Sequence, residues 1–134
     1  MPVTYEIDNK RSIIHTSCTG AVTFDEVVGH FSALARDPAC PDRLDVLLDL
    51  TRLETAPTSD QLMRITEVIG QAREKVRFGA CAIVAPSDLL FGFMRMFEVF
   101  AEEKFHSTMT FRGLDDAARW LAEQVTEPQK GPAR

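Results

Sequence analysis

The stretch LDVLLDL, residues 44–50, decides the fold class, because five of its seven residues are apolar. A strand with one solvent-exposed face alternates apolar and polar residues, whereas a strand covered on both faces is apolar nearly throughout. A second run of this kind, FGACAIVA, occupies residues 78–85. The two runs therefore predict interior strands of a mainly parallel sheet with helices packed on it.

The segments on either side add a hairpin, an edge strand and four helices. VTYEID, residues 3–8, alternates apolar and polar side chains, and SIIHTSC, residues 12–18, follows after a short turn. Together they predict an antiparallel hairpin, and HSTMTFR, residues 106–112, predicts an edge strand. Helices are predicted from Thr23 to Pro38, from Thr58 or Ser59 to Val76, from Ser87 to Phe105, and over residues 114–125.

These elements give the order β-β-α-β-α-β-α-β-α, which is typical of a single α/β domain. Strands that alternate with helices are joined by right-handed crossovers into a mainly parallel sheet, here mixed because the N-terminal hairpin is antiparallel. We expect this domain to span residues 1–126. Residues 127–134 are polar and contain proline and glycine, so we expect a flexible C-terminal tail there.

Composition excludes several classes of partner. The chain has 134 residues and a formal net charge of −5, without a basic cluster, so it would repel nucleic acid and anionic membranes. No run is long enough for a transmembrane helix, and the first residues do not resemble an export signal. The three cysteines form no Cys-x-x-Cys pair and are expected to be reduced. We therefore expect a cytoplasmic protein.

The third predicted helix, LLFGFMRMFEVFAEEKF at residues 89–105, is unusually rich in phenylalanine and methionine. Phe91 and Val99 fall toward its charged face, beside Arg95, and there they need a cover. Three alternatives would shield Phe91 and Val99 from water: the neighbouring helix, a second subunit, or a ligand at the carboxyl edge of the sheet. One broad arc toward the sheet is predicted for the other apolar residues: Leu89, Leu90, Phe93, Met94, Met96, Phe97, Phe100 and Ala101.

The sequence shows no catalytic constellation, so we expect no enzyme activity, no metal and no cofactor. His15, His30 and His106 fall on different elements, and no Gly-rich loop joins a strand to a helix. Asp49 ends the buried run at the expected ligand-binding edge, where a carboxylate could act as an acid, a base or a ligand. The favoured interpretation is that Asp49 accepts backbone N–H bonds in the following loop.

Three segments, LLDLTRLE, AIVAPSDLLFGFMRMFE and FRGLDDAARWL, resemble the SpoIIAA-like family. This family belongs to the STAS superfamily of sulfate-transporter and anti-sigma-factor-antagonist domains and is likened in fold to the lipid-binding CRAL-TRIO domains. The resemblance covers roughly residues 5–122. It implies a STAS-like fold and a role in protein–protein contact.

In STAS antagonists a serine in an Asp-Ser-Ser-Gly motif is phosphorylated at the start of the helix after the central strand. The matching residues here are Thr58-Ser59-Asp60-Gln61, so the resemblance implies Thr58 and Ser59 as phosphorylation candidates. The order differs, however, the glycine is missing, and Asp60 would repel the phosphate. The favoured interpretation is an ordinary helix cap.

The sequence supports two hypotheses about function. The leading hypothesis is a non-enzymatic, STAS-like regulatory module that binds protein, as a homodimer through the third helix, with Phe91, Arg95 and Val99 as contact candidates. The alternative is a carrier of a small hydrophobic or lipid-like ligand. Its cavity would lie between the third helix and the sheet. Phe91, Met94 and Phe97 would line this cavity, with Asp49 or Ser87 as a polar anchor at its mouth.

Overall fold

The computed structural model describes residues 2–126 and confirms the predicted order of elements. The predicted tail, residues 127–134, lies outside the described residues. None of the described helices is long and apolar enough to cross a membrane. The elements are β1 (Val3–Asp8), β2 (Ile13–Gly20), α1 (Phe24–Ala35), β3 (Arg43–Leu53), α2 (Ser59–Ala72), β4 (Arg77–Val84), α3 (Asp88–Phe100), β5 (Ser107–Phe111) and α4 (Leu114–Thr126).

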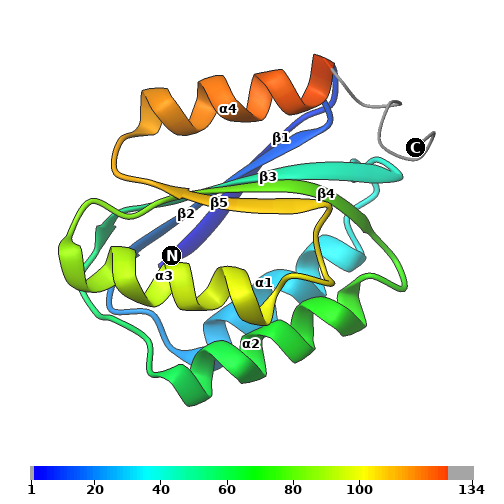
Figure 1. The fold of residues 1–134 in the computed structure, drawn as a ribbon. Coiled ribbons are helices and arrows are strands. Elements are labelled where there is room, and N and C mark those ends of the chain that lie inside the picture. Colours follow the sequence, from blue (N-terminus) through cyan, green and yellow to red (C-terminus); the bar gives the residue numbers. More distant parts are fainter. Residues whose placement is uncertain (1, 127–134) are drawn as a thin grey trace.

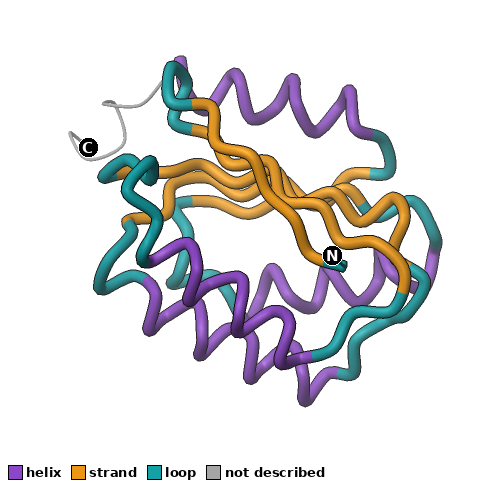
Figure 2. The backbone as a smooth tube through the Cα atoms, turned by 180° about the vertical axis from the view of Figure 1, so that it is seen from behind, coloured by secondary structure: helices purple, strands orange, loops and turns teal. Residues whose placement is uncertain are grey.

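The five strands form one sheet in the order β1-β2-β3-β4-β5, with β1 antiparallel to β2 and the other pairs parallel. Each parallel strand joins the same side of the growing sheet, and right-handed crossovers then place every connecting helix on one face. Figures 1 and 2 show α1, α2 and α3 together on that face and α4 alone on the other. The predicted α/β class and mixed sheet are confirmed.

The centre of the core is β4, as its apolar sequence predicted. Every residue from Phe78 to Ala85 is buried, because β3 and β5 flank the strand and helices cover both faces. The pairing of β3 with β4 is interrupted by a bulge at Asp45 of β3. There the Asp45 Oδ1 accepts a 2.8 Å hydrogen bond from the Ala80 N–H. Gly79 lies against the Asp45 carboxylate and the Arg43 guanidinium, where a β-carbon would collide with both.

The buried stripe of α3 is narrower than the predicted arc. Leu90, Met94, Phe97 and Ala101 are buried, but Leu89 is 64% exposed and Met96 37% exposed. The prediction was wrong for these two residues because α3 is the last helix of its layer. Only α2 lies beside it, so the outer flank of α3 remains in water.

The buried face of α4 is also narrow. Ala117 and Leu121 pack on β3 and β4, whereas Leu114 and Ala118 are exposed. A helix alone on one face of a sheet has no neighbouring helix to cover its flanks, so only a narrow stripe is buried.

Candidate functional site

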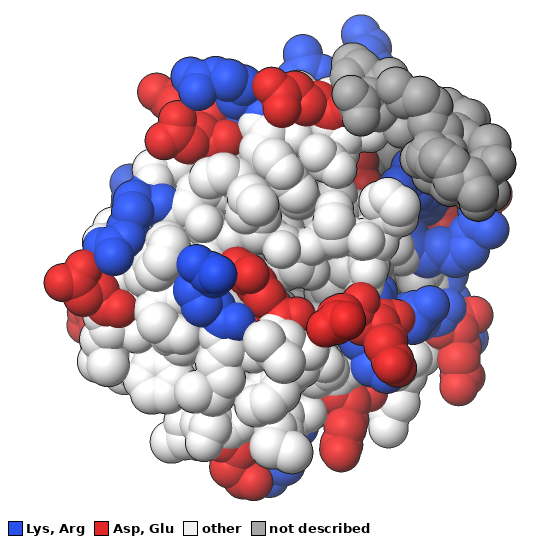
Figure 3. Space-filling model, in the orientation of Figure 1, with Lys and Arg blue, Asp and Glu red and all other residues white. Residues whose placement is uncertain are grey.

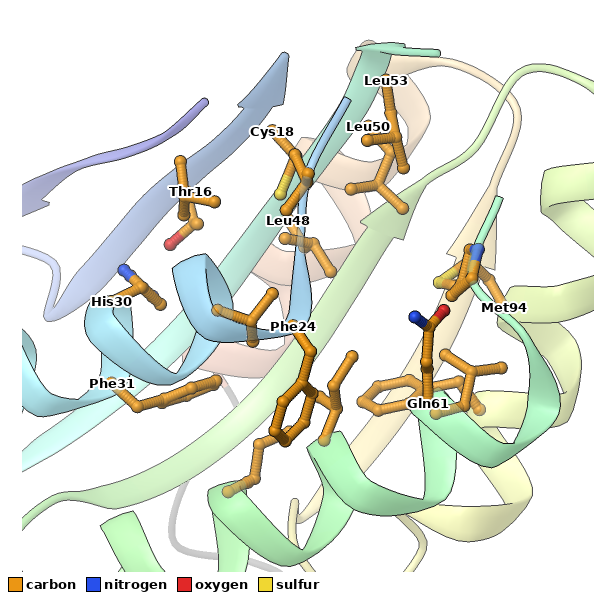
Figure 4. Close-up of a pocket in the computed structure, with 18 of the residues that line it drawn as sticks. Thr16, Cys18, Phe24, His30, Phe31, Leu48, Leu50, Leu53, Gln61 and Met94 are labelled. Carbon is orange, nitrogen blue, oxygen red and sulfur yellow. The ribbon is translucent and has the colours of Figure 1, made fainter. Parts of the chain in front are cut away.

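An apolar cavity of about 420 Å³ lies between α1, α2 and the sheet. Its volume falls within the range of small-molecule sites, whereas ordinary cores contain few voids larger than a water molecule. Figure 4 shows side chains from β2, α1, β3, α2 and α3 around it. The lining includes Ile14, Thr16, Cys18, Phe24, Val27, His30, Phe31, Leu34, Val46, Leu48, Leu50, Gln61, Leu62, Ile65, Ile69, Met94 and Phe97.

The cavity reaches the carboxyl ends of β2 and β3, where the loops before α1 and α2 contribute Ala21, Val22, Thr55 and Pro57 to its lining. The carboxyl edge of parallel strands is where open α/β sheets bind ligands. Two hydrogen bonds join these loops: Glu54 N–H donates to the Gly20 carbonyl at 2.9 Å, and Val22 N–H to Thr55 Oγ1 at 3.5 Å. The cavity therefore has the position expected of a ligand site.

Capping boxes fix the first turns of both helices beside this edge. Thr23 Oγ1 accepts from Glu26 N–H at 3.2 Å, and Glu26 Oε1 accepts from Thr23 N–H at 2.7 Å. In α2, Thr58 and Gln61 exchange the equivalent bonds at 3.1 and 2.9 Å. The predicted capping role of Thr58 is thus confirmed. Phosphorylation of Thr58 or Ser59, both exposed, stays a prediction.

No Asp, Glu, Lys or Arg belongs to the part of the lining that the structure describes. Two of the lining residues are cysteines, and burial raises the pKa of each thiol, to about 11 for Cys18 and further for Cys81. Both are therefore neutral near pH 7. Burial also lowers the pKa of His30 to about 4, so its imidazole is neutral as well. The cavity presents no formal charge to a ligand.

Asp49 lies on the other face of the sheet, because it alternates along β3 with Leu48 and Leu50, which line the cavity. Its Oδ1 accepts hydrogen bonds from the Thr51 N–H at 3.0 Å and the Thr51 hydroxyl at 2.7 Å. The predicted backbone-acceptor role is confirmed, but β3 continues to Leu53, so Asp49 does not end the strand. Asp49 is therefore not among the residues that line the cavity.

The sequence did not predict the partner of Asp49 on the neighbouring strand. His15 Nε2 lies 3.5 Å from Asp49 Oδ2, across the pairing of β2 with β3. Burial tends to raise the pKa of Asp49, but the hydrogen bonds from Thr51 and His15 outweigh it and hold that pKa below its ordinary value. Thirty-four positions separate the two residues in sequence, so only the strand register brings them together.

Of the residues predicted to line a ligand cavity, Met94 and Phe97 do so and Phe91 does not. Phe91 packs against the core and lies under the guanidinium of Arg112, 4.2 Å from the ring centroid. That guanidinium is held by Asp88 at 2.7 Å. The cover of Phe91 is thus a cation from the loop after β5, which was not among the predicted covers.

The predicted cavity between α3 and the sheet matches the observed one only in part. The observed cavity reaches α3 at Met94 and Phe97, and β4 at Phe78 and Cys81. Ser87, the other proposed anchor, is the N-cap of α3 and accepts from Leu90 N–H at 3.2 Å. Most of the lining comes from β2, α1, β3 and α2.

Arg95 and Val99 lie on the outer side of α3. Arg95 Nε is 3.4 Å from Glu98 Oε1, and Val99 is 67% exposed. Figure 3 shows this side of the molecule, where a broad uncharged surface extends around a few charged side chains. The exposed large apolar residues of α3, β5 and α4 are Leu89, Met96, Val99, Met109 and Leu114.

The remaining polar groups do not suggest a metal centre. Among the described residues, no group of three or more His, Cys, Asp or Glu side chains is arranged to hold a metal ion. A smaller hollow between α3 and β5 contains Glu98, Glu102 and His106. Glu98 already accepts a 2.6 Å hydrogen bond from the buried Thr110 hydroxyl, which ties it to the structure of the sheet.

The strand order, the parallel crossovers and α4 on the opposite face define a SpoIIAA-like fold, as the sequence predicted. A similar solved structure is an uncharacterized protein of the DUF3478 family from Shewanella loihica PV-4, which has this fold. The two share 17% sequence identity, with a TM-score of 0.59 over 89% of this chain and 91% of that one. No family model matches the sequence, and no curated protein matches it significantly.

Proposed function

We propose that the protein binds one neutral, apolar small molecule in the cavity between α1, α2 and the sheet. The observation that carries this proposal is the volume of about 420 Å³ beneath two helices whose first turns lie at the carboxyl edge of the sheet. A well-packed core would fill such a space with side chains. Binding, rather than catalysis, is the role that this apolar lining supports.

The lining favours apolar ligands, because binding removes their apolar surface from water. It disfavours ions, because binding removes their hydration. Each square ångström of apolar surface removed from water stabilises the complex by about 25 cal/mol. A carboxylate or an ammonium group would lose its hydration and find no opposite charge among the lining residues. The ligand class is therefore neutral and mostly hydrocarbon.

Titration with 1-aminoanthracene, a neutral dye whose fluorescence rises in apolar surroundings, tests this proposal. We expect saturable binding of one dye per chain and a rise in melting temperature with dye concentration. Val46→Phe should abolish binding, because Val46 lies in the floor of the cavity and a phenyl ring occupies the space.

Val99→Phe is the matched control, because it adds the same ring on the exposed side of α3. This variant should bind dye like the unaltered protein. The proposal is overturned if the unaltered protein binds no dye, or if Val46→Phe binds it equally well.

A second candidate function is self-association through α3, the homodimer that the sequence predicted. The exposed side chains of Leu89, Met96 and Val99 favour it, because they would be removed from water by a second copy of the chain. In this role the protein would be a regulatory interaction module of the STAS type. Such a module acts through protein contact and needs no catalytic residue.

Sedimentation equilibrium at micromolar concentration tests the dimer. The double substitution Leu89→Lys and Val99→Lys should shift a dimer to monomer, since it places like charges in the interface. Met63→Lys is the control, because Met63 is equally apolar and exposed but lies on α2. A monomer in the unaltered protein, or a dimer that survives the double substitution, would exclude this candidate.

A further inference from the structure

One hydroxyl in the lining of the cavity has no hydrogen-bond partner among the described residues. Thr16 lies on β2, is only 4% exposed and lines the cavity. Within the part of the chain that the structure describes, no hydrogen bond involves its hydroxyl. Figure 4 shows Thr16 above α1, with its oxygen on the side of the residue that faces the helix. A hydroxyl that a bound ligand encloses without a hydrogen bond costs about 1–3 kcal/mol, so this position favours a ligand group that supplies one.

The surroundings of Thr16 decide what kind of group the ligand supplies. His30, which also lines the cavity, is enclosed by the rings of Tyr5 and Phe31, with centroids 5.3 and 5.0 Å away. Its Nδ1 is buried without a hydrogen bond. An anion would therefore meet a neutral imidazole here and no cation among the described lining residues. A neutral ligand group is required.

We propose that Thr16 binds a hydroxyl group of the ligand, which makes the ligand class a neutral apolar alcohol or phenol. A hydroxyl both donates and accepts, so it satisfies the threonine hydroxyl in either role, whereas a carbonyl only accepts. The apolar remainder of the ligand then lies between α1 and α2 against the residues described above. This inference rests on the proposed binding function and adds the position and chemistry of one polar contact.

Three probes with the same rings test it: naphthalene, 2-naphthol and 2-naphthoate, each measured at pH 7 by displacement of 1-aminoanthracene. The quantity of interest is the ratio of the naphthalene and 2-naphthol dissociation constants. Thr16→Val removes the hydroxyl and keeps the shape, so the preference for 2-naphthol should fall about tenfold, the value of one net hydrogen bond. Naphthoate should bind at least about 100-fold more weakly than 2-naphthol, because its charge is not compensated.

Thr66→Val is the matched control. Thr66 is also buried, but its hydroxyl donates to the Leu62 carbonyl within α2 at 2.8 Å, and it does not line the cavity. This substitution should leave the ratio unchanged. Naphthalene binding by Thr16→Val shows in the same experiment that the variant is folded.

The outcomes separate the two proposals. If both neutral probes bind and Thr16→Val leaves their ratio unchanged, the hydroxyl contact is wrong and the binding function stands. If naphthoate binds most tightly, the neutral ligand class is wrong. If the unaltered protein binds none of the probes, the binding function fails together with the inference.

Discussion

His30 is a titratable residue held neutral beside the cavity. Burial lowers its pKa to about 4 from an ordinary value of 6.5, so the unfolded chain takes up a proton before the folded protein does. The free energy of unfolding should therefore decrease as the pH falls from 6.5 to about 4, by about 3 kcal/mol in total from this group. Above pH 6.5 the stabilisation is complete.

Urea unfolding at a series of pH values between 4 and 7.5 measures this dependence. His30→Gln, which cannot titrate, should show a shallower dependence than the unaltered protein across that window. Other groups contribute equally to both proteins, so the difference between the two curves isolates His30. Parallel curves would contradict the prediction.

Gly79 is a second residue whose environment leads to a sharp prediction. The β-carbon added by Gly79→Ala would push the Asp45 carboxylate away from the Ala80 N–H, whose hydrogen bond it accepts. Both groups are buried. We expect a loss of at least about 2 kcal/mol in the free energy of unfolding at pH 7. Gly92→Ala on α3 is the control, because its β-carbon meets open space, and it should stabilise the helix by about 1 kcal/mol. Equal effects would contradict this account.

At the scale of helices and strands, the caps of α1 and α2 lead to a prediction about stability and binding together. Thr23→Ala removes the hydroxyl that accepts from Glu26 N–H, and should cost about 1 kcal/mol in urea unfolding. Because the first turn of α1 lies at the mouth of the cavity, the same change should weaken 1-aminoanthracene binding. Ser32→Ala, an exposed change in the middle of α1, should do neither. An unchanged stability would show that the cap contributes nothing.

The sequence predicted strands and helix starts better than helix faces. Apolar runs such as residues 78–85 and capping boxes such as Thr23–Glu26 are local signals, and the structure contains both. The exposed positions of Leu89 and Met96 depend on which helix lies beside α3, and periodicity within one helix does not contain that information. The contact of Arg112 with Phe91 could not be predicted for the same reason, because Arg112 lies 21 residues later, outside α3.

At the scale of the whole molecule, burial should produce a gradient of hydrogen exchange. Amides of β4 should exchange most slowly, because β3 and β5 pair with it on both sides and residues 78–85 are buried. The edge strands β1 and β5 should exchange earlier. Hydrogen–deuterium exchange followed by mass spectrometry measures this order. Slower exchange in β1 than in β4 would contradict the layered arrangement of the core.

The location of the cavity could be predicted only in part. The sequence predicted a cavity between α3 and the sheet, and two of the residues assigned to it, Met94 and Phe97, belong to the lining of the observed cavity. The sequence did not predict that most of the cavity lies over β2 and β3. A cavity remains where the side chains of two packed layers do not fill the space between them, and these layers come from segments far apart in sequence. Thr16 is recognised as a candidate ligand contact only from the structure, where its hydroxyl has no hydrogen-bond partner among the described residues. Its sequence context is that of an ordinary strand.

The order β1-β2-β3-β4-β5 also has a consequence for synthesis on the ribosome. Every strand pairs with the strand made just before it, so a nascent chain can extend its sheet as each new strand emerges. The face of β4 that carries Ala80, Ala82 and Val84 is covered later, because its cover is α4, which is made after all five strands. Until α4 has left the exit tunnel, we expect that apolar face to be exposed and open to binding by chaperones.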